Sequence, residues 1–476
     1  MDEVNSLSNY LARPSVGIVS MFCCFKAKSL FGTLKWNGGF DIIQAMTDSK
    51  KIPQLSSVIL SRRDFGKIGI GALLSGYWSE TMMAHTGLQQ GKYLDLPSGF
   101  SVKMISRTGD RLGDGFRTPG LPDGMGCFMG RGGEWVLMCN HELLSSHSKV
   151  SPYYFQQDVP DLAYDPLEIG GVSRLVLDPD DLHVKRSHMA LLGTSRNCAG
   201  GISPWGWLTC EETFHSNAGV DHGFVFLCSH LFEGLNKPEP IRAYGRFNHE
   251  AAVVDGKSSV AYLSEDRADG CLYRFLPSNP QRPFDGKLQV LGLAEPVNKK
   301  DAMLEGETVA CRWLDLPRVD TKQDRLRHIA KSLGAITFVR GEGLWLDGSD
   351  LYLSTTAGGR NNKGQIWRFS PAGDGVNKGQ LKLVIQPDDS RELDMPDNIT
   401  VGPNGSLFIA EDGSGEQYIR LLKQNGNLSS FAKNSYSGSE ITGVCFSPDY
   451  STLFCNLQHD GITLAIRGPF NKFCSA

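Results

Sequence analysis

Downstream of residue 90, hydrophobic residues occur in short runs that lack the 3.6-residue spacing of an amphipathic helix. These runs alternate with turns rich in Gly, Pro, Asn and Asp, as in "VVDGKSSVAYL" at residues 253–263. Short apolar runs bounded by such turns are typical of β-strands. The pattern therefore predicts an all-β protein.

One hairpin pattern recurs along this part of the chain. Each copy has a polar residue, a strand, a turn with Asp, Gly or Pro, and a second strand that ends on a polar or acidic residue. In the clearest copy, Glu250 stands at the start and Glu265 and Asp266 stand at the end. The copies begin at residues 123, 198, 250, 342, 397 and 442. A recurring hairpin favours a repeat architecture over a β-sandwich. We predict a six-bladed β-propeller with insertions between the blades over residues 85–476.

The repeat predicts where the polar ends of the hairpins meet. The start of the first strand and the end of the second lie at the same edge of a hairpin, and the innermost hairpins of a propeller line its channel. The residues expected around one mouth of the channel are Asp123, Glu142, Cys198, Glu211 or Glu212, Glu250, Glu265, Asp266, Glu342, Asp397, Glu411 and Asp412. So many carboxylates would repel one another, so we expect a cation among them.

The types of residue in this ring indicate two kinds of metal. Hard oxygen ligands in this number suit Ca²⁺, whereas the thiolate of Cys198 favours a transition metal as well. Cys198 lies among polar residues and glycines in "RNCAGG", while most other cysteines lie in apolar runs and are expected to pack in the core. His141 and His249 each precede a ring glutamate, so strand alternation points them away from the ring.

The N-terminal part contains a targeting pattern. "SRRDFGKIGIGALLSG" joins Arg62 and Arg63 to an apolar run that is too short and too rich in Gly to span a bilayer permanently. We interpret residues 61–84 as a twin-arginine export signal, which implies the twin-arginine export machinery as a partner and a periplasmic or extracellular location. Residues 1–60 are interpreted as an extension that is disordered or results from an upstream start site.

The net charge of the chain bears on which classes of partner to expect. A formal net charge of −4 gives no reason to expect binding to nucleic acid or to an anionic membrane surface. We expect no stable transmembrane segment, and we expect a monomer.

Ten short motifs resemble those of PhoX-type alkaline phosphatases and occur in the same order. They are "SRRDF", "DGM", "NHE", "NCAGGISPWGWLTCEE", "GRFNHEAA", "YLSED", "YRF", "RGEGLW", "PDN" and "ITGVCFSPD". Apart from the first, they cover roughly residues 95–470. The tryptophan motif is one residue shorter than the usual form in that family.

The resemblance implies a phosphatase with Fe³⁺ and Ca²⁺ in the channel mouth. Carried onto the matching positions, it makes Cys198 an iron ligand that is also part of the catalytic site, and it makes Arg340 a contact for phosphate. It further implies that these carboxylates bind metal: Glu250, Glu342, Asp397 or Asp412, and, for calcium, Glu211 and Glu212. Glu142 and Glu265 are candidate ligands from the hairpin pattern.

The function predicted from the sequence is metal-dependent hydrolysis of phosphate monoesters for phosphate scavenging. A calcium-dependent lactonase or esterase on the same fold is an alternative, but its single Ca²⁺ would give Cys198 no role. A non-catalytic binding propeller in the cell envelope is a second alternative, but it would not need a ring of metal-binding side chains.

Overall fold

The structure is a computed structural model that describes residues 87–475 except for residues 155–157, 296–302 and 373–376. The predicted N-terminal extension and export signal, residues 1–60 and 61–84, lie outside the described residues. Within the described ranges, no helix is long and apolar enough to cross a membrane.

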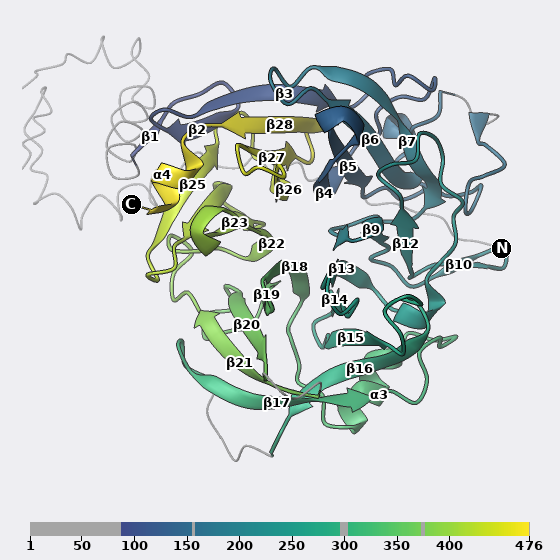
Figure 1. Ribbon diagram of the computed structural model, residues 1–476, viewed down its shortest axis with the longest axis vertical. Helices are drawn as coiled ribbons and strands as arrows, with labels where there is room; N and C mark the ends of the chain where they lie inside the picture. Colours follow the sequence, from purple (N-terminus) through teal and green to yellow (C-terminus); the bar gives the residue numbers. More distant parts are fainter. Residues whose placement is uncertain (1–86, 155–157, 296–302, 373–376, 476) are drawn as a thin grey trace, which may run out of the picture. The chain divides into compact units, whose positions relative to one another are not determined.

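The strands form antiparallel sheets that stand around a common centre (Figure 1). One four-stranded sheet contains β4 (Pro122–Met129), β5 (Trp135–His141), β6 (Gly170–Leu177) and β7 (Val184–Thr194). A three-stranded sheet contains β8 (Gly201–Ser203), β9 (Gly206–Cys210) and β12 (Val225–Cys228), and a short ribbon pairs β10 (Ser216–Asn217) with β11 (Val220–Asp221). The second four-stranded sheet contains β26 (Ile441–Phe446), β27 (Thr452–Leu457), β28 (Ile462–Arg467) and β3 (Ser101–Arg107).

Two larger sheets complete the ring. A six-stranded sheet contains β22 (Pro396–Val401), β23 (Leu407–Glu411), β24 (Tyr418–Leu422), β25 (Leu428–Asn434), β2 (Leu94–Pro97) and β1 (Leu88–Gln89). A nine-stranded sheet contains β13 (His249–Val254), β14 (Ala261–Glu265), β15 (Leu272–Pro277), β16 (Gly286–Leu293), β17 (Thr308–Asp315), β18 (Gly341–Asp347), β19 (Asp350–Thr355), β20 (Gln365–Pro371) and β21 (Lys378–Ile385). The helical elements are short: α3 (Leu326–Ser332), α4 (Phe470–Ser475) and the 3-10 turns η1 (Arg131–Gly133), η2 (Ser148–Val150), η4 (Arg242–Tyr244) and η5 (Pro403–Gly405).

The innermost strands form a closed ring. Contacts join β4 to β8, β8 to β13, β13 to β18, β18 to β22, β22 to β26, and β26 back to β4 (Figure 1). The two ends of the described chain close this arrangement, because β3 pairs with β28 and β2 pairs with β25. The all-β, propeller-like arrangement predicted from the hairpin repeat is confirmed.

The hydrogen-bonded sheets of the described residues differ from six separate four-stranded blades. β17, which lies in an insertion between β16 and β18, pairs with β16 on one side and with β21 on the other. This strand joins β13–β16 and β18–β21 into one sheet, because an exposed sheet edge accepts any strand that offers free backbone groups. The hairpin pattern did not predict this bridging strand, because the pairing of β17 with β21 joins segments that are distant in the sequence.

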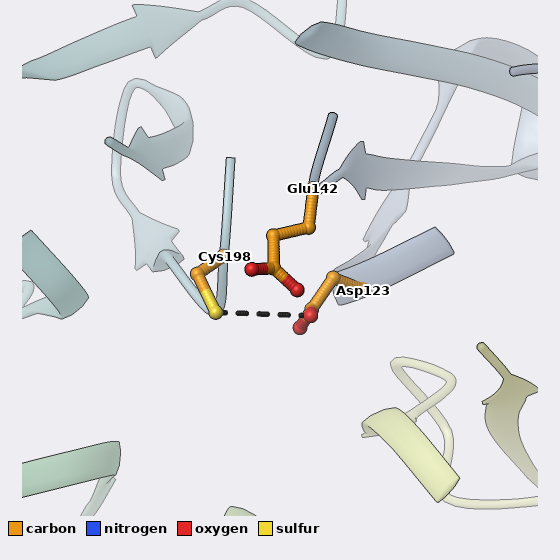
Figure 2. A group of neighbouring side chains, drawn as sticks. All are labelled: Asp123, Glu142 and Cys198. Carbon is orange, nitrogen blue, oxygen red and sulfur yellow. Dashed lines mark hydrogen bonds between the residues drawn. The ribbon is translucent and has the colours of Figure 1, made fainter. Parts of the chain in front are cut away.

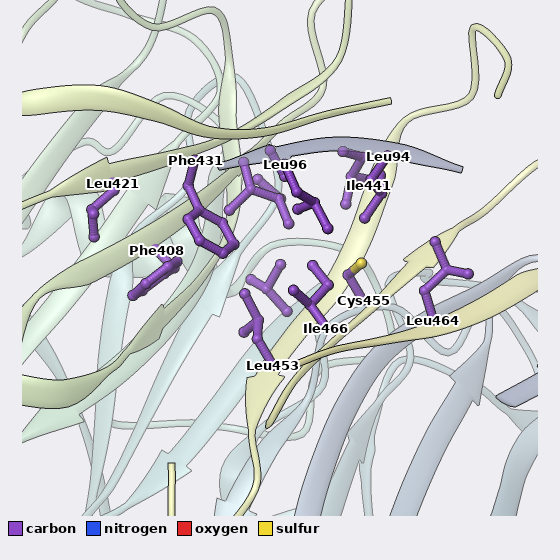
Figure 3. Packing of buried hydrophobic residues seen from close by; sticks show 14 of the residues in the cluster. Leu94, Leu96, Phe408, Leu421, Phe431, Ile441, Leu453, Cys455, Leu464 and Ile466 are labelled. Carbon is purple, nitrogen blue, oxygen red and sulfur yellow. The ribbon is translucent and has the colours of Figure 1, made fainter. Parts of the chain in front are cut away.

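Apolar side chains fill the space between neighbouring sheets. Phe408 and Phe431 of one sheet are wholly buried with Leu453 and Ile466 of the next (Figure 3). The rings of Phe408 and Phe431 meet edge to face, with centroids 5.1 Å apart. Each such side chain contributes roughly 1.5–3 kcal/mol by leaving water. This packing fixes the inner strands, whose ends carry the polar residues described next.

Candidate metal centre

A cavity of about 920 Å³ lies where the inner hairpins end. The acidic residues that line it are Asp123, Glu142, Glu212, Glu250, Asp266, Glu342, Asp397, Asp412 and Glu440. Cys198, Arg196 and Arg340 line the same cavity. Since these residues span more than 300 positions of the chain, the ring of inner strands is what brings them together.

Most first strands of the inner hairpins carry a β-bulge at the residue that faces the cavity. The pairing register shifts between Pro122 and Met125, His249 and Ala252, Gly341 and Leu344, and Pro396 and Ile399. The residues within these bulges include Asp123, Glu250, Glu342 and Asp397. A bulge turns a side chain out of the regular alternation, and here it turns a carboxylate toward the cavity.

A glycine follows two of these carboxylates because neighbouring inner strands approach closely there. A Cβ atom on Gly124 would lie 1.6 Å from the carbonyl oxygen of Ala199, and one on Gly343 would lie 2.7 Å from that of Asp397. Any side chain at these positions would push neighbouring hairpins apart. The "DG" and "EG" sequence pairs are therefore explained by backbone packing.

Three pairs of consecutive acidic residues end the second strands, and only the second member of each pair lines the cavity. The pairs are Glu211 and Glu212, Glu265 and Asp266, and Glu411 and Asp412. Successive side chains of a strand point to opposite faces. The first member is therefore buried in the body of the protein, and the second reaches the cavity.

Glu211 is wholly buried and accepts hydrogen bonds from the protein interior. Its donors are the backbone N–H groups of Ser195, Gly223 and Phe224, at 3.0, 2.8 and 3.2 Å, and its other close partner is Nδ1 of His222, at 2.7 Å. These bonds tie together the segments on either side of the hairpin that carries Cys198. Glu211, predicted as a calcium ligand, does not line the cavity.

Glu265 is also wholly buried and outside the cavity lining. Its Oε2 accepts a hydrogen bond of 2.7 Å from the hydroxyl of Tyr273 and one of 3.3 Å from the backbone N–H of Cys271. Asp266, the next residue, takes the position expected of Glu265. Of the residues proposed from the sequence as ligands, Glu211 and Glu265 are the two that the structure does not bring to the cavity.

Three groups of donor atoms lie close enough to share a cation. In each group the donor atoms are all within 4.8 Å of one another, and the groups are Asp123 with Glu142 and Cys198, Cys198 with Glu212 and Glu250, and Glu250 with Glu342 and Asp397. Figure 2 shows the first group, in which the Cys198 thiol and the two carboxylates converge from separate elements. Cys198 and Glu250 each belong to two groups, so the donors form one connected row that has room for more than one ion.

Burial makes the ionised form of these carboxylates unfavourable unless a cation lies beside them. Burial is the largest cause that raises the pKa of Asp123 and of Glu250, and neighbouring carboxylates raise both pKa values further. Oδ1 of Asp123 and Oε2 of Glu250 are buried without a hydrogen-bond partner. Unpartnered buried carboxylate oxygens are what a metal ion would satisfy. The residues therefore fit a metal centre with oxygen ligands and one sulfur ligand.

Arg340 lies at the edge of this row with its side chain fixed. Its Nε and Nη2 each donate a hydrogen bond of 3.0 Å to the carboxylate of Asp266, and Nη2 lies 3.1 Å from Oε1 of Glu342. The side chain is 36% exposed, so it remains open to the cavity. A guanidinium held on one edge by carboxylates presents its other edge to an anion.

Several cavity residues were missed by the hairpin pattern. Gln458 donates hydrogen bonds to Oδ2 of Asp123 and Oε2 of Glu142, at 2.8 and 3.0 Å. Glu440 and Gln458 line the cavity at the sixth hairpin copy, which the sequence pattern begins at Thr442. The backbone N–H of Gln458 donates to the carbonyl of Glu440, so the hairpin extends to a residue before Thr442, and the hairpin pattern did not mark this extension.

The hairpin pattern also missed Arg196, although its position relative to the next candidate ligand could have revealed it. It precedes Cys198 by two residues, as Arg340 precedes Glu342. Leu144 and the residues from Ser146 to Val150, which include η2, also line the cavity. It lies between β5 and β6, where the sequence showed no repeat.

The two histidines next to ring glutamates lie outside the cavity lining, as strand alternation predicts. Nδ1 of His141 lies 3.0 Å from the carbonyl of Gly120, and Nε2 of His249 lies 3.1 Å from that of Gly245. Burial lowers the pKa of His141 to about 4 and that of His249 to about 3. The ten cysteines in the described ranges are unpaired, and all of them except Cys198 are buried.

Comparisons with known proteins show the family and the fold that this chain resembles. The family model described as "Alkaline phosphatase PhoX" matches residues 83–184 and 180–461. No curated protein sequence matches the chain. Among solved structures, Pseudomonas fluorescens PhoX in complex with vanadate, a transition state analogue, has a TM-score of 0.64 at 19% identity and covers 80% of this chain and 97% of its own. A gluconolactonase from Xanthomonas campestris has a TM-score of 0.38 at 16% identity over 77% of this chain and 95% of its own.

Proposed function

The chain belongs to the PhoX alkaline phosphatase family, and from this premise we propose that it is a metal-dependent phosphatase that hydrolyses phosphate monoesters. The observation that carries the proposal is the row of buried and partly buried donor groups from Asp123 to Asp397, next to the guanidinium of Arg340 in one cavity. Pseudomonas fluorescens PhoX, whose fold is similar, was solved in complex with vanadate, a transition state analogue. We propose that a phosphoryl group binds in the corresponding cavity of this chain.

The proposed centre contains Fe³⁺ and Ca²⁺. Cys198 would hold iron, since sulfur is a poor ligand for calcium, and the carboxylates of Glu250, Glu342 and Asp397 would complete the cluster. When bound, such a cluster neutralises the charge on phosphoryl oxygens and supplies the nucleophile. Glu142, Glu212 and Asp412, which the sequence also proposed as ligands, remain candidates because all three line the cavity.

The chain's own residues would orient the substrate. Arg340 would donate hydrogen bonds from its free edge to the phosphoryl oxygens, whose negative charge grows toward the transition state. Asp266 fixes the other edge of that guanidinium at 3.0 Å. Fixing the donor before the substrate arrives lowers the entropy lost in the transition state.

We also propose that the ring is a six-bladed propeller exported for phosphate scavenging. The closed ring of β4, β8, β13, β18, β22 and β26 supports six blades, with β17 an insertion that bridges two of them. Export through the twin-arginine route, and a periplasmic or extracellular location, rest on residues 61–84.

Elemental analysis combined with an activity assay tests the proposal. Protein purified without chelators is expected to contain both iron and calcium and to hydrolyse p-nitrophenyl phosphate. Calcium without iron, together with hydrolysis of a lactone and none of p-nitrophenyl phosphate, would overturn the proposal in favour of a lactonase. Iron is the decisive element, because a single calcium site would leave Cys198 without a role.

A further inference from the structure

We propose that Arg196 is a second phosphate-binding residue, which forms a two-arginine clamp with Arg340 and favours phosphate monoesters over diesters. This inference rests on the proposed function of the same cavity. Arg196 follows β7, and Arg340 precedes β18, so the two residues are 144 positions apart in the sequence. Both line the cavity.

The hairpin repeat makes the two arginines structurally equivalent. Each lies two residues before a candidate ligand, Cys198 or Glu342. Each has a left-handed backbone, with φ of 50° at Arg196 and 56° at Arg340. The carbonyl of Arg196 accepts a hydrogen bond from the N–H of Glu212 at 2.9 Å, and that of Arg340 accepts one from Thr356 at 3.1 Å.

The backbone at this position does not require arginine. Leu121 and Met395 occupy the equivalent places in two other hairpins, with φ of 44° and 54°, and their carbonyls accept the equivalent bonds from Glu142 and Asp412. Left-handed φ favours glycine or asparagine over any long side chain. The strain is thus common to the repeat, and what distinguishes Arg196 and Arg340 is the charge that they bring to the cavity.

The two guanidiniums are held in the same way. Nε and Nη2 of Arg196 donate to Oε1 of Glu142 at 3.1 and 2.7 Å, and Nη2 also pairs with Glu212. Nε and Nη2 of Arg340 bond Asp266, and Nη2 also pairs with Glu342. Both side chains are 36% exposed. In the described part of the chain, the Nη1 group of neither arginine has a hydrogen-bond or ion-pair partner, so each has a donor left for a ligand.

Ion pairs place both guanidiniums against the same row of donor atoms. Nη2 of Arg196 pairs with Glu212, and Nη2 of Arg340 pairs with Glu342. Glu212 also belongs to a donor group with Cys198 and Glu250. The two guanidiniums therefore flank the proposed metal centre.

The clamp has a consequence for substrate class. A monoester presents three non-bridging oxygens and a charge close to −2, so it can accept hydrogen bonds from two guanidiniums. A diester presents two such oxygens and a charge of −1, so the second guanidinium gains less from it. Arg196 is therefore expected to contribute more to monoester than to diester hydrolysis.

The test uses the metal-loaded protein and Arg196→Lys, which keeps the positive charge beside Glu142 and loses the planar fork. Binding of inorganic phosphate is measured by equilibrium dialysis, with iron and calcium content measured on the same samples. Phosphate binding is expected to weaken about 10-fold or more with unchanged metal content, since a charge-assisted bidentate contact is lost. The ratio of kcat/KM for p-nitrophenyl phosphate to that for bis-p-nitrophenyl phosphate is expected to fall.

Two further variants sharpen the test. Arg267→Lys is the matched control, because Arg267 is 39% exposed, pairs with Asp324 and does not line the cavity. It is expected to leave phosphate binding unchanged. Arg196→Gly relieves the left-handed backbone, and millimolar guanidinium ion is expected to restore its phosphate binding in part.

Two results would overturn the clamp. One is phosphate binding by Arg196→Lys equal to that of the unaltered protein. The other is loss of metal from Arg196→Lys in proportion to lost phosphate binding, since Arg196 would then act only by positioning Glu142 and Glu212. Failure of the proposed function is distinguishable: unaltered protein that binds phosphate through Arg196 but does not hydrolyse p-nitrophenyl phosphate would refute the phosphatase and leave the clamp supported.

Discussion

The thiol of Cys198 lies 3.7 Å from Oδ2 of Asp123, although 75 residues separate them in the sequence (Figure 2). Burial, followed by the charge of Asp123, raises the pKa of this thiol well above its usual value. A thiolate is therefore unfavourable here unless a cation lies beside it. Metal binding at this pair would release a proton from the sulfur.

Cys198→Ser is expected to lose iron and to lower phosphatase activity by at least about 100-fold, because a hydroxyl replaces the sulfur ligand. The circular dichroism spectrum is expected to stay unchanged, since Cys198 is not part of the apolar core. Cys474→Ala, a change at a buried cysteine in α4, serves as the control and should keep both iron and activity. Full activity in Cys198→Ser would contradict the assignment of iron to this residue.

Glu211→Gln is expected to change stability, whereas Glu212→Gln is expected to change metal binding, although the residues are adjacent. Glu211 accepts hydrogen bonds from buried N–H groups, so its loss of charge should lower the free energy of unfolding by about 1.5–3 kcal/mol with metal content retained. Glu212 lines the cavity, so its substitution should weaken metal binding with little change in the stability of metal-free protein. Urea unfolding and elemental analysis measure the two effects, and metal loss in Glu211→Gln alone would contradict the placement.

The contrast between these neighbours shows what the sequence could and could not predict. Hairpin geometry is local, so the repeat led to the cavity and to most of the residues that line it. The bulges at Asp123, Glu250, Glu342 and Asp397 add a residue to the inner strand. A one-residue shift reverses which side chains face inward. In the hairpin that carries Cys198, Asn197 pairs with Glu211 and Gly201 pairs with Leu208, so one extra residue lies on the first strand there too. Strand alternation counted from the sequence therefore could not separate Glu211 from Glu212.

The hairpin repeat could not predict contacts between segments that lie far apart in the sequence. β17 belongs to no hairpin copy, yet it bridges β16 and β21. Gln458 reaches Asp123, which lies 335 residues earlier, because the last inner strand is next to the first. Such contacts are set by closure of the ring, which no local pattern encodes.

Removal of metal is expected to make stability depend on pH in a direction opposite to ordinary acid unfolding. Burial, together with neighbouring carboxylates, raises the pKa of Glu212 and of Asp397 to about 8. The folded state thus holds protons that the unfolded state releases near pH 4, so stability is fully present below about pH 4 and is lost as pH rises through about 8. Protein treated with EDTA should show a melting temperature that falls between pH 5.5 and 8.5, as measured by circular dichroism. Metal-loaded protein is the control and should show a smaller fall, and a rise in the metal-free protein would contradict the prediction.

Asn140→Ala is expected to destabilise the hairpin that carries Cys198. Asn140 is wholly buried, accepts a 2.8 Å hydrogen bond from Nε1 of Trp207, and donates one of 2.5 Å to the carbonyl of Cys198. Alanine would leave both partners unpaired inside the protein, which costs about 1–3 kcal/mol for each group.

Urea unfolding should show this loss, and iron should dissociate faster during dialysis because the backbone of Cys198 is no longer held. Asn279→Ala, at an exposed turn, is the matched control and should change stability by less than about 1 kcal/mol. Equal stability and equal iron retention in Asn140→Ala and the control would show that Asn140 does not position Cys198.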